Sequence, residues 1–310
     1  MELLKQGLNI DFLGKRNIAI AFSIALLLIS LFALISRGLN FGIDFTGGTV
    51  VEVGYTEAAD LEQIRSVLAE QGYDAKVQYF GSSREVLIRL APIEGIDQAV
   101  LGDTIIESLQ AASDGDAVKR RIEFVGPQIG EELRDQGGMA MLWALLGILI
   151  YVALRFEFRF SLGAIIALVH DVMITLGFFA VTQYQFDLTV LAAFLAVIGY
   201  SLNDTIVVFD RIRENFRSMR RVTTEEAINT SVNQTLSRTL MTSITTLIVL
   251  ITLFLFGGET IHSFAVALIV GVLIGTYSSI FVASTATLLM GVTPEDLIPD
   301  EDDEELDNIP

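Results

Sequence analysis

The 310-residue sequence contains no cysteine and only two histidines, His170 and His262. Without cysteine the chain can form no disulfide, iron–sulfur cluster or thiolate zinc site, and two histidines are too few for an ordinary catalytic zinc centre. The sequence also has no Walker A loop and no G-x-S-x-G motif, which ATP hydrolysis and serine-nucleophile chemistry would need. These absences predict a protein that is not an enzyme and that holds no metal or cofactor.

Basic residues are also scarce, since 20 lysines and arginines stand against 38 aspartates and glutamates and give a net charge of −18. A nucleic-acid-binding protein needs clustered Lys and Arg to displace counterions from phosphates, so no nucleic acid partner is expected. Apolar residues are abundant instead, because 52% of the chain is hydrophobic and the mean hydropathy is +0.57. This composition is typical of an integral membrane protein with several spans.

Six apolar runs predict six transmembrane helices, and an even number returns the C-terminus to the side of the N-terminus. Of the 20 lysines and arginines, 11 lie on the proposed inner side and 9 lie between Arg37 and Arg134. A segment of that length is exempt from the positive-inside rule, so both termini are predicted to be cytoplasmic. The runs cover residues 18–35, 139–154, 160–182, 188–209, 240–256 and 264–290.

The segment 37–135, between the first and second spans, is polar enough to form a separate α+β domain. Its hydrophobic periodicity alternates between strand and helix in the order βαββαβ. This order is the ferredoxin-like pattern, with two helices on one face of a small antiparallel sheet. The predicted strands cover 48–55, 75–81, 84–90 and 117–126, and the predicted helices cover 57–72 and 95–112.

The remaining chain divides into three parts. Residues 1–36 form the N-terminus and first span, and residues 136–292 form the other five spans, with a cytoplasmic loop at 210–238. The tail 293–310 carries nine carboxylates and no basic residue, so it is predicted to be solvated and disordered. A solubilising tail and a docking peptide for a basic partner both remain open.

Two carboxylates, Asp171 and Asp204, fall inside predicted spans. A carboxylate at the centre of a membrane helix costs about 2.5–3.5 kcal/mol on insertion scales, and such groups commonly mark ion or proton paths. Both are therefore candidate proton-translocation residues, although Asp204 could instead be a neutral or paired group that only joins helices. Asp171 follows His170, and adjacent side chains on a helix point about 100° apart. The pair is therefore not expected to face one cavity together.

The fifth span carries a polar stripe at spacings of three and four residues, which must be shielded from lipid. Arg238 in this stripe is either a positive-inside anchor at the helix start or a fixed charge near Asp204. In the second interpretation Arg238 and Asp204 form a switchable proton carrier, because a guanidinium keeps its proton and favours an ionised carboxylate beside it. The stripe consists of Thr235, Arg238, Thr239, Thr242, Thr245 and Thr246.

The last span has four small residues at a four-residue repeat, Gly271, Gly275, Ser279 and Ala283. Small residues in one line let neighbouring membrane helices approach closely. The pattern therefore predicts a helix-packing face and favours it over a direct role in transport.

Several segments together closely resemble the SecD/SecF family of bacterial protein-export membrane proteins, within the resistance–nodulation–division (RND) superfamily. The resemblance is to the smaller subunit of that family and extends over nearly the whole chain in the family's motif order. The segments are LNFGIDFTGGT (39–49), VGPQIGEELRDQG (125–137), LVHDVMIT (168–175), GYSLNDTIVVFDRIRENFR (199–217) and TLSRTLMTSITT (235–246).

The resemblance implies a six-helix RND half-transporter that lies in the lipid of the bacterial inner membrane, has a periplasmic α+β domain and pairs with SecD. It implies use of the proton-motive force to assist export of unfolded protein through SecYEG, with H⁺ as the coupling ion. The family residues linked to proton passage fall on Asp204 and Arg238, and SecD adds a further intramembrane carboxylate. Two alternatives remain: a scaffold subunit for SecD without its own proton relay, and half of a small-molecule RND exporter.

Overall fold

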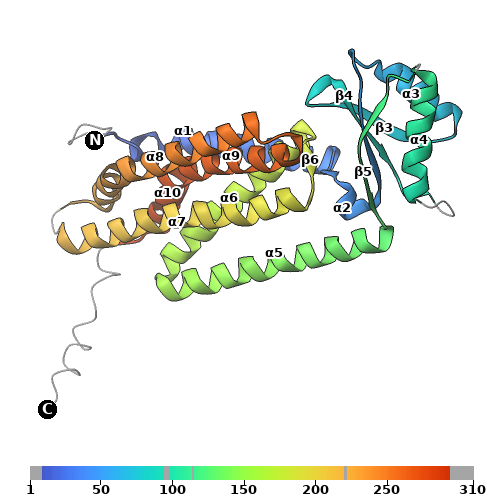
Figure 1. Cartoon of the computed structure of the whole chain (residues 1–310). Helices are drawn as coiled ribbons and strands as arrows, with labels where there is room; N and C mark the ends of the chain where they lie inside the picture. Colours follow the sequence, from blue (N-terminus) through green and yellow to red (C-terminus); the bar gives the residue numbers. More distant parts are fainter. Residues whose placement is uncertain (1–8, 94–97, 114, 220–221, 294–310) are drawn as a thin grey trace.

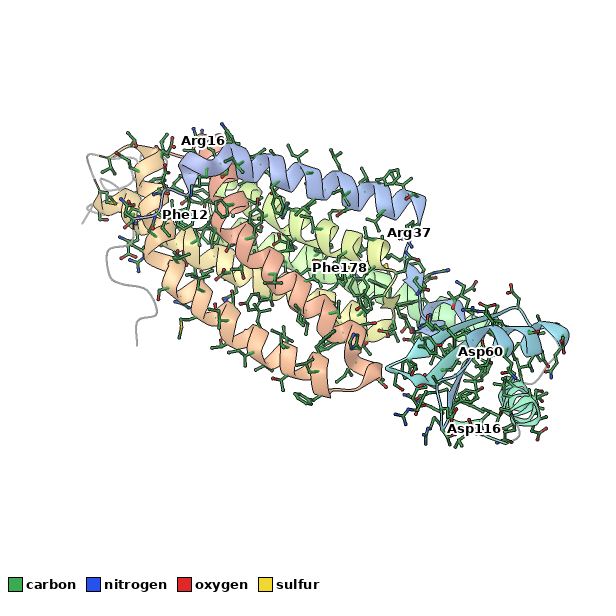
Figure 2. All side chains as sticks on the ribbon, turned by 90° about the horizontal axis from the view of Figure 1, so that it is seen from above. Phe12, Arg16, Arg37, Asp60, Asp116 and Phe178 are labelled. Atoms are coloured by element: carbon green, nitrogen blue, oxygen red, sulfur yellow. The ribbon has the colours of Figure 1, made fainter. Side chains whose placement is uncertain are left out.

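The computed structural model describes residues 9–93, 98–113, 115–219 and 222–293. A long bundle of helices carries a smaller α+β domain at one end (Figure 1). Phe12 and Arg16, near the start of the chain, lie at the opposite end of the bundle from Asp60 and Asp116 of the domain (Figure 2). The predicted acidic tail lies outside the described residues from 294 onward.

Six helices of the described chain are long and apolar enough to cross a membrane, which confirms the prediction of six spans. The first five are α1 (Arg16–Ser36), α5 (Pro127–Arg155), α6 (Phe158–Thr182), α7 (Leu188–Ser218) and α8 (Thr224–Phe256). The last span joins α9 (His262–Tyr277), a π-helical segment η3 (Ser278–Ala283) and α10 (Ser284–Leu289). Short 3-10 turns, η1 (Leu13–Lys15) and η2 (Glu259–Ile261), precede the first and last spans.

The segment 210–238 was predicted to be a loop, but most of it is helical. The helix α7 continues to Ser218, and α8 begins at Thr224. A capping box starts α8: the Thr223 hydroxyl accepts the Glu226 N–H at 3.2 Å, and the Glu226 carboxylate accepts the Thr223 N–H at 3.0 Å. This T-x-x-E pair satisfies groups that a helix N-terminus otherwise leaves without partners. The apolar run marks where a helix leaves the membrane, but it does not mark where the helix ends.

The domain has the predicted βαββαβ order. It contains β2 (Gly48–Gly54), α3 (Leu61–Glu70), β3 (Ala75–Phe80), β4 (Ser82–Leu90), α4 (Gln98–Ala112) and β5 (Val118–Val125). The four strands pair antiparallel in the order β3-β4-β2-β5, which confirms the ferredoxin-like prediction. Val51 and Val53 of β2 lie in the core with Ile64 of α3 and Ile105 of α4, because alternate strand side chains point to the same face.

Additional contacts fasten the domain to the bundle. β1 (Asn40–Phe41) pairs in parallel with β6 (Gln185–Phe186), which lies between α6 and α7. In the short helix α2 (Ile43–Thr46), Asp44 accepts the backbone N–H of Leu188 at the start of α7, at 3.0 Å. Five aromatic rings surround this joint: Phe41, Phe45, Phe179, Phe186 and Phe194.

The six spans differ in how far they are buried. About half of the apolar window is buried in α6, α7 and the last span (56%, 50% and 50%), compared with 22% in the first span, 11% in α5 and 17% in α8. The first group therefore forms the centre of the bundle. The outer faces of α1, α5 and α8 are left to lipid or to another protein.

Candidate functional site: two buried carboxylates in the helix bundle

Asp204 lies on α7 with 6% of its surface exposed, at the junction of three helical segments. One carboxylate oxygen accepts the hydroxyl of Thr239 on α8 at 3.0 Å. The other accepts the hydroxyl of Ser279 on η3 at 2.8 Å. The carboxylate therefore points into the bundle, and neutral hydroxyl groups hold both of its oxygens.

Ser279 belongs to the small-residue repeat that predicted only helix packing. Two members of that repeat do pack closely against α7: a Cβ added at Gly271 would lie 2.2 Å from Val197, and one added at Gly275 would lie 3.0 Å from Ser201. Ser279 instead donates to Asp204, from the π-helical segment of the last span. π-helical turns are rare and frequently occur at functional sites. From spacing alone, Ser279 counts only as a small side chain, so the contact between its hydroxyl and Asp204 was not predicted.

Further hydroxyls continue from Asp204 toward the domain end of the bundle. Ser243 of α8 lies with its Oγ 2.6 Å from that of Thr276 on α9. Tyr200, one turn before Asp204 on α7, donates to the same Ser243 at 3.1 Å. The interface of α7, α8 and α9 is therefore lined by groups that can hold water or pass a proton.

Arg238 does not bond to Asp204 in the structure, which describes both residues: the oxygens of Asp204 meet Thr239 and Ser279, and the Arg238 side chain is exposed. Thr239 takes the place facing Asp204, and Arg238, one position earlier, points about 100° away around α8. A direct bond between the two is therefore absent in this conformation of the single chain, although Arg238 lies near enough for its charge to act on the Asp204 carboxylate.

The polar stripe of the fifth span is only partly shielded. Thr235 and Thr239 are buried, whereas Arg238, Thr242 and Thr245 are exposed. The prediction that the stripe is shielded from lipid is met by this chain only at its buried members, and the rest would need a covering partner. Part of the stripe faces outward because α8 is an outer helix of the bundle.

Asp171, on α6, is fully buried, and its carboxylate forms two contacts. One oxygen lies 2.8 Å from Nδ1 of His170, and the other accepts the hydroxyl of Ser201 on α7. The sequence expectation concerned one shared cavity; the structure shows a direct contact between the two side chains, which that expectation did not include. Although adjacent side chains leave a helix in different directions, the imidazole bends back far enough to reach the neighbouring carboxylate.

His170 extends this second site to α1 and α9. Its Nε2 lies 3.1 Å from the hydroxyl of Ser23, and that hydroxyl lies 2.9 Å from the hydroxyl of Tyr277. Tyr277 also donates to the carbonyl of Ala19 at 2.8 Å. Ser23, Tyr277 and Ser201 were not predicted. They come from three other helices, and an isolated hydroxyl in an apolar run gives no signal of its own.

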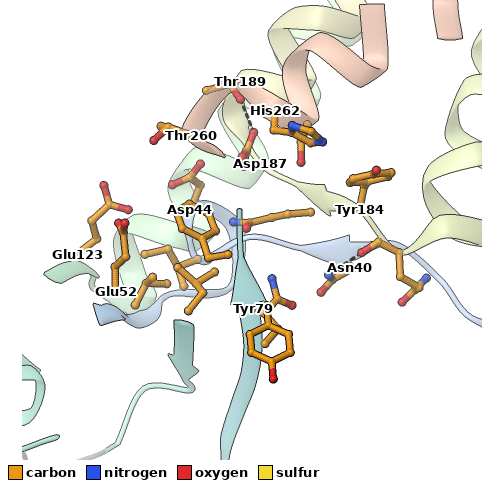
Figure 3. A pocket seen from close by; sticks show the side chains of 18 of the residues that line it. Asn40, Asp44, Glu52, Tyr79, Glu123, Tyr184, Asp187, Thr189, Thr260 and His262 are labelled. Atoms are coloured by element: carbon orange, nitrogen blue, oxygen red, sulfur yellow. Dashed lines mark hydrogen bonds between the residues drawn. The ribbon is translucent and has the colours of Figure 1, made fainter. Parts of the chain in front are cut away.

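A cavity of about 470 Å³ lies elsewhere, between the sheet and the end of the bundle. Figure 3 shows Glu52 and Glu123 on the sheet side of this cavity and Tyr184, Asp187 and His262 on the bundle side. Burial raises the pKa of Glu52 above its usual value and the charge of Glu85 adds to the rise, while Arg121 and Arg120 partly offset it. Neither Asp171 nor Asp204 lines this cavity, so it is separate from the carboxylates in the bundle.

Within the described ranges, no group of three or more Asp, Glu or His side chains could hold a metal ion. The fold and its buried groups thus define a polytopic helical membrane protein with ionisable side chains inside the bundle and an α+β domain at one end. A family model described as "Protein export membrane protein SecD/SecF, C-terminal" matches residues 105–293, and a SecD/SecF GG motif model matches residues 32–59. The chain belongs to the SecD/SecF family of protein-export membrane proteins.

Individual relatives agree with this assignment and with the resemblance seen in the sequence. Proteins named protein translocase subunit SecF from Vibrio alginolyticus and Pseudomonas aeruginosa are each 50% identical to the chain; the alignments cover 98% and 97% of this chain and 97% and 98% of those proteins. A crystal structure of SecDF, described as a translocon-associated membrane protein, from Thermus thermophilus is 38% identical, with a TM-score of 0.83 over 93% of this chain. A SecDF structure in a super-membrane-facing form gives a TM-score of 0.69. The chain spans 39% of the length of each SecDF chain. These names describe translocase subunits, which agrees with the prediction that the chain is not an enzyme.

Proposed function

We propose that the chain is the smaller membrane subunit of a protein-export complex, that it pairs with SecD, and that it uses the proton-motive force to assist export through SecYEG. The names of its full-length relatives support the export role. The SecDF chains, which extend well beyond the part that this chain matches, support a larger partner in the same complex.

The exposed part of α8 supports a partner within the membrane. Arg238, Thr242 and Thr245 are exposed on a helix long enough to span the bilayer. Polar and charged side chains on a spanning helix usually face protein or water rather than lipid, so a covering protein is favoured over lipid. We propose that SecD covers this face and brings its own carboxylate close to Arg238.

The observation that carries the proton role is the setting of Asp204, which is buried at a junction of three helical segments and held by hydroxyls from α8 and η3. A proton that enters along the hydroxyls of Tyr200, Ser243 and Thr276 would neutralise this carboxylate and weaken both bonds. The junction would then repack and release the proton on the other side. Each unit charge that crosses 100 mV supplies about 2.3 kcal/mol, so a few protons suffice for a modest domain motion. Arg238 serves as a fixed charge beside this path, and Asp171 is a second candidate for holding a proton.

The proposed orientation places both termini in the cytoplasm and the α+β domain in the periplasm, with the bundle in the inner membrane. The position of Phe12 and Arg16 at the end of the bundle opposite the domain supports this arrangement (Figure 2). The domain is fastened to α7 through Asp44 and the β1–β6 pair. A motion of α7 would therefore reach the domain, where the translocating unfolded chain emerges.

The experiment is export driven by the proton-motive force in membrane vesicles that contain Asp204→Asn. We expect export to fall to the level seen without the proton-motive force, because an amide cannot take up and release a proton. The matched control is Asp210→Asn on the same helix, where an exposed carboxylate pairs with Arg155 at 2.7 Å and little loss is expected. Full export by Asp204→Asn at a normal protein level would refute the proton role.

A scaffold role is the second candidate, and the missing bond between Arg238 and Asp204 favours it. In that case Asp204→Asn and Arg238→Met would lower the amount of SecD recovered with the tagged chain. In the proton-carrier case both variants retain SecD and lose only the response to the proton-motive force. Co-purification measured beside the export assay separates the two.

A further inference from the structure

Five contacts in a row cross the centre of the bundle from the Ala19 carbonyl on α1 to Ser201 on α7. They pass through Tyr277, Ser23, His170 and Asp171, at 2.8, 2.9, 3.1 and 2.8 Å, and end with the hydroxyl of Ser201 on Asp171. Ser23, His170, Asp171 and Ser201 are all buried. Each contact needs one hydrogen between its two atoms, so the number of protons in the chain of contacts can be counted.

The count begins at Tyr277, which has a single hydroxyl hydrogen. That hydrogen is used on the Ala19 carbonyl, so the Ser23 hydroxyl must supply the hydrogen between Ser23 and Tyr277. Ser23 then has none left for His170, and the hydrogen between them must be on Nε2 of the imidazole. A further hydrogen lies between Nδ1 and Asp171. The observed contacts are all satisfied only when the His170–Asp171 pair holds two exchangeable protons and has no net charge.

A second arrangement of the same atoms holds one proton fewer. If the Tyr277 hydroxyl turns from Ala19 to Ser23, the Ser23 hydroxyl can turn to Nε2 of His170, which then accepts instead of donating. The Ala19 carbonyl keeps a hydrogen bond, because it also accepts the N–H four residues later in α1. The two arrangements differ by one proton and by two hydroxyl rotations, and no helix has to move.

Among the residues that the structure describes, the side chains of other helices that contact the pair or its hydroxyl partner are uncharged. The groups facing it are Ser23 from α1, Ser201 from α7 and Tyr277 from α9. Asp204 bonds to hydroxyls of α8 and η3 instead. Loss of the proton leaves one net negative charge in the apolar centre of the bundle, which is costly unless the bundle changes its conformation or hydration.

We propose that His170 and Asp171 form a second proton-binding site of the bundle, which gains and loses one proton as the hydroxyls of Ser23 and Tyr277 rotate. The use of this site in export rests on the proposed function, whereas proton binding itself does not. The site links α1, α6, α7 and α9, so its proton content acts on α1 and α6, to which Asp204 does not bond.

The test uses the two histidines of the chain. The full-length protein, labelled with ¹⁵N in the histidine rings and held in lipid nanodiscs, is titrated with acid and base, and His262→Gln assigns the remaining signal to His170. At lower pH we expect Nε2 of His170 to carry hydrogen, either as imidazolium or as the Nε2–H tautomer. At higher pH we expect the neutral Nδ1–H tautomer.

Two tyrosine variants sharpen this test and leave the buried His170–Asp171 pair itself unchanged. Tyr277→Phe removes the oxygen to which Ser23 donates, so Ser23 turns to His170 and the Nδ1–H tautomer should persist at pH values where the unmodified chain holds the extra proton. Tyr200→Phe removes a hydroxyl from the same bundle that bonds only to Ser243, and it should leave the His170 signal unchanged. A single His170 tautomer at every pH, identical in Tyr277→Phe, would overturn the proposal.

A negative result for the second proton-binding site can be distinguished from a failure of the proposed function. In Asp204→Asn the His170 transition should persist, because Asp204 is not part of this row of contacts. Loss of export in that variant with a retained transition supports both proposals. Normal export in that variant with a retained transition removes the Asp204 role and leaves the second site standing.

Discussion

Asp204 and Asp171 lie about one helical turn apart in the bundle, because Asp171 bonds to Ser201 and Ser201 precedes Asp204 by three residues on α7. Their partners differ. Asp204 meets two neutral hydroxyls, whereas Asp171 meets one hydroxyl and an imidazole that can carry a positive charge. A buried carboxylate with a basic partner can remain ionised without net charge, but one with hydroxyls alone cannot. Uptake of one proton changes the net charge by one at either site. At Asp204 the proton binds to the carboxylate itself, whereas at the His170–Asp171 pair the imidazole and the carboxylate share it and the hydroxyls of Ser23 and Tyr277 rotate.

The largest expected effect is a difference in proton-driven export between variants of the two carboxylates. Asp204→Asn should reduce export to the level found without the proton-motive force, and Asp171→Asn should retain part of the driven component. The reason is that only Asp204 joins α7 to both α8 and η3. The assay is proton-driven export in vesicles with matched protein levels. Equal loss in both variants would mean that the two sites act as one.

A second prediction concerns stability, for which we expect Asp171 to matter more than Asp204. Asp171→Ala should destabilise the protein more than Asp204→Ala, because it leaves Nδ1 of His170 and the Ser201 hydroxyl buried without their partner, at about 1–3 kcal/mol for each unsatisfied group. After Asp204→Ala, Ser279 still donates to the Thr276 carbonyl, to which it already bonds at 3.1 Å. Thermal unfolding in detergent measures the difference. A larger loss in Asp204→Ala would contradict the contrast in their partners.

A smaller effect comes from the hydroxyls that hold Asp204. Ser279→Ala and Thr239→Val should each lower stability by about 0.6 kcal/mol, the average for a side-chain hydrogen bond within membrane proteins. Both should also impair proton-driven export, because the Asp204 carboxylate loses a hydrogen bond through which a change in its protonation would act on the neighbouring helix. Thr252→Val on the outer part of α8 is the control, because its hydroxyl bonds only to the carbonyl of Ile248. Equal effects of Thr252→Val and Thr239→Val would show that the Asp204 contact is of no special importance.

The smallest expected effect concerns Glu52, a carboxylate outside the bundle that lines the cavity between the sheet and the end of the bundle. The pKa of Glu52 is raised above its usual value of 4.5 by burial and by Glu85, so the folded domain binds more protons than the unfolded chain. The stability from this group is complete below the usual value and is lost as pH rises through the raised value. Glu52→Gln should remove this loss and make the thermal midpoint of the domain less dependent on pH. An unchanged slope would mean that Glu52 is not the titrating group.

The features that could be predicted from the sequence depend on local chemistry. The six spans follow from hydropathy, and the order of the domain follows from alternating and helical periodicity. Asp171 and Asp204 could be identified because a carboxylate in an apolar run is costly wherever the rest of the chain lies. Local capping chemistry could also have extended α8 to Thr224, since the T-x-x-E pair at Thr223 and Glu226 is visible in the sequence.

The partners of the two carboxylates could not be predicted in the same way. Ser279 was assigned to helix packing because its size fits the small-residue repeat, and its hydroxyl found Asp204 only through the π-helical turn of the last span. Arg238 lies one position from Thr239, and the rotation of α8 decided which of the two faces Asp204. Spacing along a single helix shows which residues share a face, but it does not show what that face meets.

The sequence by itself determined that this chain crosses the membrane six times, carries a ferredoxin-like domain and keeps two carboxylates within its spans, because these properties depend on residue type and periodicity. Only the tertiary structure decided that Asp204 bonds to hydroxyls, that Asp171 pairs with His170, and that Arg238 lies on an exposed face. Those outcomes depend on the rotation and depth of each helix relative to its neighbours. They are set by packing among segments that lie up to some 250 residues apart, as are Ser23 and Tyr277.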